Sequence, residues 1–205
     1  MIDSISSILE ELEEQSTLEK LKKTKILPED RMLAITKETG ELLNMILRLK
    51  NARNMLEVGM SVGYSTLWCA EAIVERSGKI ITIEKNPNKI KRARENFQKA
   101  GVKDTIIIKE GLAKSILTEL NLQKEYKSFF DFVLIDADKE NILEYFDLIL
   151  PMVSIGGVIV TDNMLYPEKY KQDMKKFSDY LRKNLSLRTI TLPIGNGEEI
   201  TIKLK

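Results

Sequence analysis

The chain of 205 residues contains no histidine. Histidine is the usual proton carrier of Ser-His-Asp and Cys-His hydrolases and a frequent zinc ligand. Its absence therefore excludes those hydrolase classes, acid–base catalysis by histidine and histidine-based zinc sites. Any metal ion must be bound by oxygen ligands, a donor set that favours Mg²⁺, Ca²⁺ or Mn²⁺.

Cysteine occurs once, at Cys69, which excludes an internal disulfide framework and fits a reducing compartment. Because Cys69 falls on the apolar face of an expected helix, we interpret it as a buried structural thiol. No apolar run approaches the length of a membrane span, and the first residues include Asp3, Glu10 and Glu11 rather than the basic start of a signal peptide. We expect a cytoplasmic protein without a membrane partner.

Charge of either sign is nearly balanced, with a formal net charge of +1, so no global attraction to nucleic acid is expected. Hydrophobic residues make up 43% of the chain and charged residues 31%, a composition typical of globular proteins. The sequence shows no linker or repeat. We predict a single domain over residues 1–205, whose residues 1–27 form an N-terminal helical extension.

Apolar runs alternate with helical periodicities along the chain. The expected strands are Asn54 to Val58, Lys79 to Ile83, Thr105 to Lys109, Phe130 to Ile135 and Gly157 to Thr161. The expected helices that follow them are Ser65 to Glu75, Asn88 to Ala100, Ala113 to Leu120, Ile142 to Leu150 and Pro167 to Leu185. This alternation predicts an α/β fold with parallel strands, right-handed crossovers and helices on both faces of the sheet.

The end of the chain has a different pattern. Two runs rich in β-branched residues, Leu187 to Leu192 and Glu199 to Leu204, flank the glycine-containing turn Pro193-Ile194-Gly195-Asn196-Gly197. Such a pattern predicts a β-hairpin. An antiparallel hairpin that closes a parallel sheet is unusual for dehydrogenases and typical of methyltransferases that use S-adenosylmethionine (SAM).

A nucleotide-like cofactor site is predicted where the first strand ends. Glu57 precedes a loop bracketed by Gly59 and Gly63, and Glu84 ends the next strand, where a carboxylate can bind a ribose diol. The spacing lacks the three glycines of the dinucleotide fingerprint. A carboxylate at Glu57 would repel phosphate but suits a cationic amino group such as that of SAM. An NAD-dependent oxidoreductase is therefore the least favoured alternative.

Polar side chains also follow two later strands. Asp136 comes directly after Ile135, and Asp162 and Asn163 come directly after Thr161. If the two strands are neighbours, these oxygen ligands converge at one edge of the sheet and suit a hard divalent cation. Lys139 would then lie close enough to accept a proton from a metal-bound hydroxyl.

These segments together resemble the cation-dependent O-methyltransferases, a family that includes caffeoyl-CoA and catechol O-methyltransferases. The similarity extends from about Leu27 to the end of the chain. It rests on four motifs: Leu56-Glu57-Val58-Gly59 with Gly63-Tyr64-Ser65-Thr66-Leu67, Ile135-Asp136-Ala137-Asp138-Lys139, Thr161-Asp162-Asn163, and Leu192-Pro193-Ile194-Gly195-Asn196-Gly197. The resemblance implies a Rossmann-like class I SAM methyltransferase fold with a mostly parallel seven-stranded sheet, and a homodimer.

The resemblance also implies residue roles. Lys139 would be the general base, with Asp136 beside it in the catalytic centre, and the metal ligands would be Asp136, Asp162 and Asn163. Tyr166, where relatives often carry tryptophan, would contact the acceptor, a catechol-like or other small molecule with vicinal oxygens. The implied SAM contacts are Glu57, Gly59, Met60, Gly63, Tyr64, Ser65, Glu84, Gly111, Ala113 and Asp136.

Two other functions stay open. Bacterial relatives methylate 5-hydroxyuridine in transfer RNA, and the basic runs Lys20 to Lys25 and Lys169 to Lys176 would then contact RNA. The chain could also bind SAM without catalysing transfer. Intact Asp136, Lys139 and Asp162 disfavour that second alternative.

Overall fold

The computed structural model describes residues 2–205, which form one seven-stranded sheet in the order β3-β2-β1-β4-β5-β7-β6. The strands are β1 (Asn54–Val58), β2 (Lys79–Glu84), β3 (Ile106–Glu110), β4 (Phe130–Ile135), β5 (Val153–Thr161), β6 (Leu187–Leu192) and β7 (Glu198–Lys203). Strands β1 to β5 pair in parallel, whereas β7 lies antiparallel between β5 and β6. The predicted parallel sheet with a C-terminal antiparallel hairpin is confirmed.

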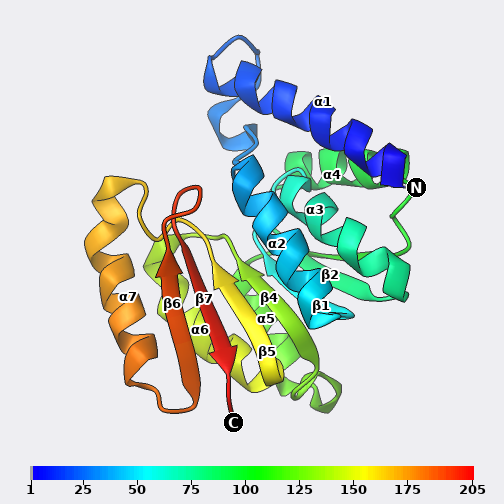
Figure 1. Cartoon of the computed structure of the whole chain (residues 1–205). Helices are drawn as coiled ribbons and strands as arrows, with labels where there is room; N and C mark the ends of the chain where they lie inside the picture. Colours follow the sequence, from blue (N-terminus) through cyan, green and yellow to red (C-terminus); the bar gives the residue numbers. More distant parts are fainter. Residues whose placement is uncertain (1) are drawn as a thin grey trace.

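Helices cover both faces of the sheet (Figure 1). They are α1 (Ile2–Lys20), α2 (Lys37–Lys50), α3 (Tyr64–Ile73), α4 (Pro87–Lys99), α5 (Ala113–Leu122), α6 (Ile142–Ile149) and α7 (Lys171–Lys183). Helices α1 to α4 pack over one face, and α5, α6 and α7 pack over the other. One-turn 3-10 helices connect several of them: η1 (Pro28–Asp30), η2 (Val74–Arg76), η3 (Lys124–Tyr126), η4 (Lys139–Asn141), η5 (Leu150–Met152) and η6 (Glu168–Tyr170).

Two apolar layers hold the helices to the sheet. On the α1–α4 side, Leu67 and Phe97 pack with Phe132 of β4, and on the other side Phe146 and Phe177 meet edge to face at 5.7 Å. Burial of such side chains contributes roughly 1.5 to 3 kcal/mol each. Cys69 is fully buried in the first layer, and this burial raises the pKa of its thiol, as a structural role requires.

Most boundaries agree with prediction within two residues, but two elements begin four residues from the expected position. Strand β5 begins at Val153 rather than Gly157, because Gly156 and Gly157 lie in an irregularity opposite Phe130 and Phe132. Helix α7 begins at Lys171 rather than at Pro167, since Glu168–Tyr170 form the separate turn η6.

The N-terminal extension is a long helix fastened to the domain. Glu13 of α1 accepts a hydrogen bond from the Tyr64 hydroxyl at 2.8 Å, and the Glu19 carboxylate accepts hydrogen bonds from Arg92 at 2.7 Å and from the Met32 amide at 2.6 Å. The segment that follows α1 is thereby held against α4. None of the helices within residues 2–205 combines the length and the apolar character that crossing a bilayer requires.

Candidate active site

A cavity of about 820 Å³ opens at the carboxyl ends of the parallel strands. This edge is where ligands bind in open α/β sheets. Eight predicted site residues line it, and all of them except Ala113 and Tyr166 lie at the end of a strand or within two residues after it: Gly59, Glu84, Gly111, Ala113, Asp136, Asp162, Asn163 and Tyr166. The sequence prediction of where these residues gather is thus matched by the geometry.

Gly59 allows the ends of β1 and β4 to approach each other. Its φ is +99°, and a Cβ at this position would lie 1.9 Å from the backbone oxygen of Asp136. The Asp136 amide donates to the Val58 carbonyl at 2.9 Å, and the Asp162 amide donates to the Ile135 carbonyl at 3.1 Å. The backbone pairing therefore continues past the strand ends and places both aspartates at the same edge.

Glu84 is held at the wall of the cavity by backbone amides. Its Oε2 accepts a hydrogen bond from Ser61 at 2.8 Å, and its Oε1 accepts from Lys85 at 2.8 Å and from Asn86 at 2.9 Å. A carboxylate has about four lone-pair sites, so the group keeps acceptor capacity toward the cavity. This arrangement fits the predicted contact with a ribose diol.

A compact charged cluster lies beside the ends of β4 and β5. Lys139 Nζ is 3.8 Å from Asp136 Oδ1 and makes no hydrogen bond with the rest of the described chain. Burial, together with the Asp162 charge, raises the pKa of Asp136 to about 7 against the lowering effect of Lys139. Burial also raises the pKa of Asp162. Keeping the two aspartates ionised in this cluster therefore costs electrostatic free energy.

Glu198, which the sequence interpretation missed, completes this cluster. The side chain is fully buried, its Oε1 accepts a hydrogen bond from the Thr39 hydroxyl at 2.9 Å, and its Oε2 has no hydrogen-bond partner within residues 2–205. Burial and the contact with Asp162 raise the pKa of Glu198 to about 10. No local pattern marked Glu198, because two adjacent glutamates after a hairpin turn usually face solvent on at least one side.

The donor set at this edge suits a hard divalent cation. Asp136 and Asp162 supply carboxylate oxygens, and Asn163, with a left-handed φ of 64°, lines the same cavity. Within residues 2–205 no three acidic or cysteine side chains lie close enough to hold a metal ion by themselves. The third protein ligand would therefore be the amide oxygen of Asn163, with the remaining positions left for water and acceptor oxygens.

Other predicted site residues do not line the cavity. Glu57 is fully buried, and its carboxylate accepts hydroxyl hydrogen bonds from Ser65 and Thr66 at 2.6 Å each and from Thr82. Burial raises the pKa of Glu57, and these hydroxyl groups oppose the rise. The carboxylate thus ties β1 to α3 and β2, and the cofactor contacts expected of Glu57 and Ser65 stay predictions.

Met60, Gly63, Tyr64 and Lys139 do not line the cavity either. Met60 is buried in the apolar layer, the Tyr64 hydroxyl is bonded to α1, and a Cβ at Gly63 would meet the Phe97 ring at 2.5 Å. The expected cofactor contacts of the first three therefore lack support from their side chains. Lys139 lies behind Asp136, and its role as a base stays a prediction.

Residues without a predicted role complete the wall. Asp138 lines the cavity while accepting hydrogen bonds from the Tyr145 hydroxyl at 2.8 Å and from the Asn141 amide. Asn196, at the hairpin turn, lines it as well, and its carbonyl accepts from the Leu165 amide at 2.9 Å. The hairpin thus supports the loop that carries Asn163 and Tyr166. This contact was not predicted, because the hairpin and the loop are far apart in sequence.

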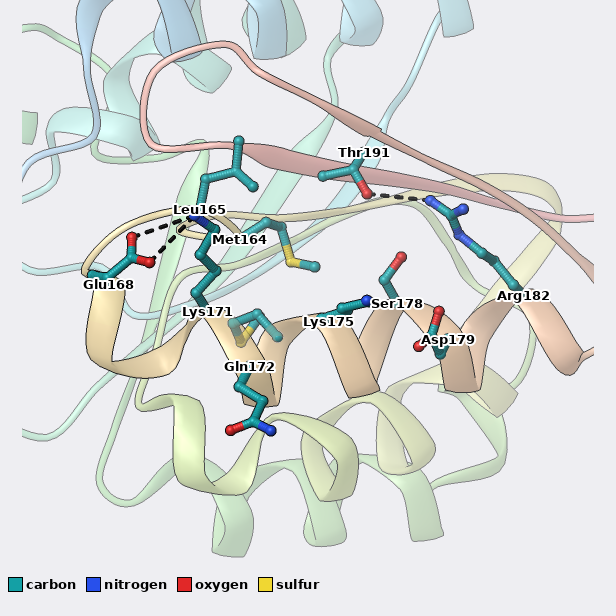
Figure 2. A pocket seen from close by; sticks show the side chains of 11 residues that line it. Met164, Leu165, Glu168, Lys171, Gln172, Lys175, Ser178, Asp179, Arg182 and Thr191 are labelled. Atoms are coloured by element: carbon teal, nitrogen blue, oxygen red, sulfur yellow. Dashed lines mark hydrogen bonds and ion pairs between the residues drawn. The ribbon is translucent and has the colours of Figure 1, made fainter.

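A second cavity, of about 530 Å³, lies between α7, β6 and the loop after β5, and Figure 2 shows its lining side chains. Two of the cations on α7 have nearby partners: Lys171 is 3.3 Å from a Glu168 oxygen, and Arg182 donates to the Thr191 hydroxyl at 3.4 Å. None of the predicted site residues lines this cavity. The candidate active site is therefore the larger cavity.

Comparisons with known proteins agree with this geometry. A family model described as O-methyltransferase matches residues 6–204. The caffeoyl-CoA O-methyltransferase 2 of Populus trichocarpa is 32% identical over 189 residues, which cover 85% of this chain and 76% of that protein. The O-methyltransferase of Bacillus cereus in complex with SAH superposes with a TM-score of 0.81 at 26% identity, covering 96% of this chain and 90% of that one.

A further solved structure has the same architecture. TomG of Streptomyces achromogenes, an O-methyltransferase in complex with SAM, has a TM-score of 0.79 at 26% identity, and the match covers 98% of this chain and 90% of that chain. The predicted class I SAM methyltransferase fold is confirmed by these neighbours together with the sheet order.

Proposed function

The chain belongs to the O-methyltransferase family, and from this premise we propose that it transfers the methyl group of SAM to a hydroxyl of a small acceptor with two vicinal oxygens, with the help of a divalent cation. The observation that carries the proposal is the convergence of Asp136, Asp162 and Asn163 on a cavity that also presents Glu84. This one cavity thus holds both a fixed carboxylate that could bind a ribose and a set of oxygen donors that could bind a cation.

The binding of SAM is supported by this chain's own residues and by its neighbours. Glu84 would accept hydrogen bonds from the ribose hydroxyls, and Gly111, which follows β3, and Ala113, which begins α5, would border the adenine. The printed descriptions of the two solved neighbours name SAH and SAM as their ligands. Because the cavity is about 820 Å³, it has room for such a molecule and a small acceptor.

Asp136, Asp162 and Asn163 would hold the cation, and Lys139 would receive the proton of the acceptor hydroxyl at Nζ. When bound, the cation would lower the pKa of a coordinated hydroxyl, and SAM would supply the methyl group. The acceptor oxygen would form a bond to the methyl carbon as the carbon–sulfur bond breaks and SAH leaves, and Lys139, acting as a neutral amine, would take up the hydroxyl proton. Tyr166 and Asn196 would confine the acceptor, which favours reaction by proximity.

The test is transfer of labelled methyl from SAM to catechol, with Mg²⁺ and with excess EDTA. We expect transfer with Mg²⁺, loss with EDTA, and loss in Lys139→Met without loss of SAH binding. Asp179→Asn, an exposed carboxylate outside the cavity, is the matched control and should behave as wild type. Equal methyl transfer in EDTA would refute the proposed dependence on a divalent cation. Binding of SAH without transfer to catechol, but with transfer to transfer RNA, would replace the small acceptor by RNA.

A further inference from the structure

One wall of the active-site cavity is cationic. It is formed by the end of α1, the segment after η1 and the first turn of α4, and it carries Lys20, Arg31, Lys85 and Lys89. Lys20 and Lys85 reach solvent, where hydration stabilises their charge. Arg31 and Lys89 differ, because the Lys89 side chain is mostly buried and the Arg31 side chain is partly buried.

Lys89 is only 8% exposed, and its ammonium makes no hydrogen bond or ion pair with any of residues 2–205. It also occupies the first turn of α4, which begins at Pro87, and the positive end of a helix dipole disfavours a cation there. Arg31 likewise has a buried Nε without a hydrogen-bond partner in the described chain. Leaving buried charges unpaired costs free energy unless a partner arrives from elsewhere.

The acidic side chains nearby are already engaged. Glu19 accepts from Arg92 and from the Met32 amide, while the Asp30 carboxylate accepts from the side-chain amides of Asn86 and Asn88 at 2.9 Å each. The Asp30 carbonyl also accepts from Arg92 at 2.7 Å. These contacts hold the segment that carries Arg31 against the start of α4. The two cations are thus positioned by the fold, but nothing in the wall neutralises them.

We propose that Arg31 and Lys89 form an anion subsite of this cavity, which binds a carboxylate or phosphate group carried by the methyl acceptor. The inference rests on the proposed function, which it narrows to acidic acceptors. The carboxylate of SAM is the other possible source of an anion. The affinity of the variants for SAH, which keeps this carboxylate, distinguishes the two sources.

The kinetic test compares catechol with 3,4-dihydroxybenzoate, which adds one carboxylate to the same vicinal diol. We expect wild type to favour the acid in kcat/KM, and both Arg31→Gln and Lys89→Met to reduce this preference about tenfold, the usual effect of losing a hydrogen bond to a charged group. Because the test compares the ratio of kcat/KM for the two acceptors, a general loss of activity cancels. Lys91→Met, an exposed lysine on the same helix, is the matched control.

Two outcomes would overturn the subsite. One is an unchanged preference ratio in both variants. The other is a loss of SAH affinity, measured by calorimetry, that parallels the loss of preference, because the cations would then serve the cofactor. Lys89→Met should also melt no lower than wild type, since it removes an unpaired charge from a mostly buried side chain. A lower melting temperature would reveal a structural partner and contradict the inference.

A binding experiment separates this inference from the proposed function. Pyrophosphate is titrated into the SAH-loaded protein at low salt, with no turnover required. We expect binding to wild type and to Lys91→Met, and at least about tenfold weaker binding to Arg31→Gln. If no acceptor is methylated but pyrophosphate binding depends on Arg31, the proposed function fails and the subsite stands. If catechol is methylated and pyrophosphate does not bind, the subsite fails alone.

Discussion

Replacing Asp136 by asparagine should make the metal-free protein more stable at neutral and alkaline pH. Asp136 is largely buried beside Asp162, and its side chain is only 18% exposed. The desolvation of its carboxylate and the Asp162 charge oppose ionisation, and Lys139 compensates for them only in part. Asp136→Asn keeps the shape of the side chain and removes the charge. Lys139 still faces the carboxylate of Asp162, so the substitution does not leave it isolated.

The size of the effect follows from the shift in protonation. The pKa of Asp136 rises from 3.8 to about 7 on folding. Since a tenfold change in an equilibrium constant corresponds to about 1.4 kcal/mol, ionising this group costs the fold at most about 4 to 5 kcal/mol. Between these two pKa values the unfolded chain binds fewer protons than the folded one, so the stability of the wild type falls as pH rises. The advantage of the variant is near zero at about pH 4 and largest above about pH 7.

Urea unfolding in EDTA, at several values between about pH 5 and about pH 8, measures the difference directly. We expect the free energy of unfolding of Asp136→Asn to exceed that of wild type increasingly with pH, while Asp179→Asn shows no such trend. With saturating Mg²⁺, wild type should gain stability and the variant should gain less, because ligand binding to the folded state stabilises it. A variant less stable than wild type in EDTA at high pH would refute this account of the cluster.

Three further results are expected. Asp162→Ala should abolish cation-dependent methyl transfer while SAH still binds within about twofold in calorimetry, since it removes a cation ligand and leaves Glu84 in place. Glu84→Ala should weaken SAH binding about tenfold or more and affect cation affinity less. An SAH affinity equal to that of wild type would disprove the ribose contact. Gly59→Ala should lower the free energy of unfolding by about 2 kcal/mol or more in thermal or urea denaturation, because φ is +99° and its Cβ would overlap the Asp136 backbone.

The convergence of the site was predictable because parallel strands end at a common edge. Asp136 and Asp162 each follow a buried apolar strand, so their meeting required only that β4 and β5 be neighbours. The direction of each side chain was harder to predict. Glu57 lies within β1, and its burial depends on hydroxyl groups supplied by α3 and β2. The sequence signalled a functional carboxylate, but not that three hydroxyl donors satisfy it inside the fold.

The cationic wall was beyond prediction for a related reason. Arg31 and Lys89 are separated in sequence by α2, β1, α3, η2 and β2, and a lysine in a polar helical turn ordinarily faces solvent. Only the hydrogen bonds from Asn86, Asn88 and Arg92 to Asp30 reveal that the two segments are joined. Such side-chain contacts between distant segments leave no periodic signal along the chain.

The position of Glu198 likewise depends on a contact between segments that are distant in sequence. The hairpin register pairs Glu199 with Thr161, which brings the neighbouring Glu198 against Asp162 at the end of β5. Asp136, Asp162 and Glu198 then oppose the single buried ammonium of Lys139. Carboxyl groups gathered in this way must share protons or acquire positive charge. The proposed reaction brings a divalent cation and a sulfonium to this edge. The charge balance of the buried cluster therefore favours cationic ligands independently of the motifs that first suggested them.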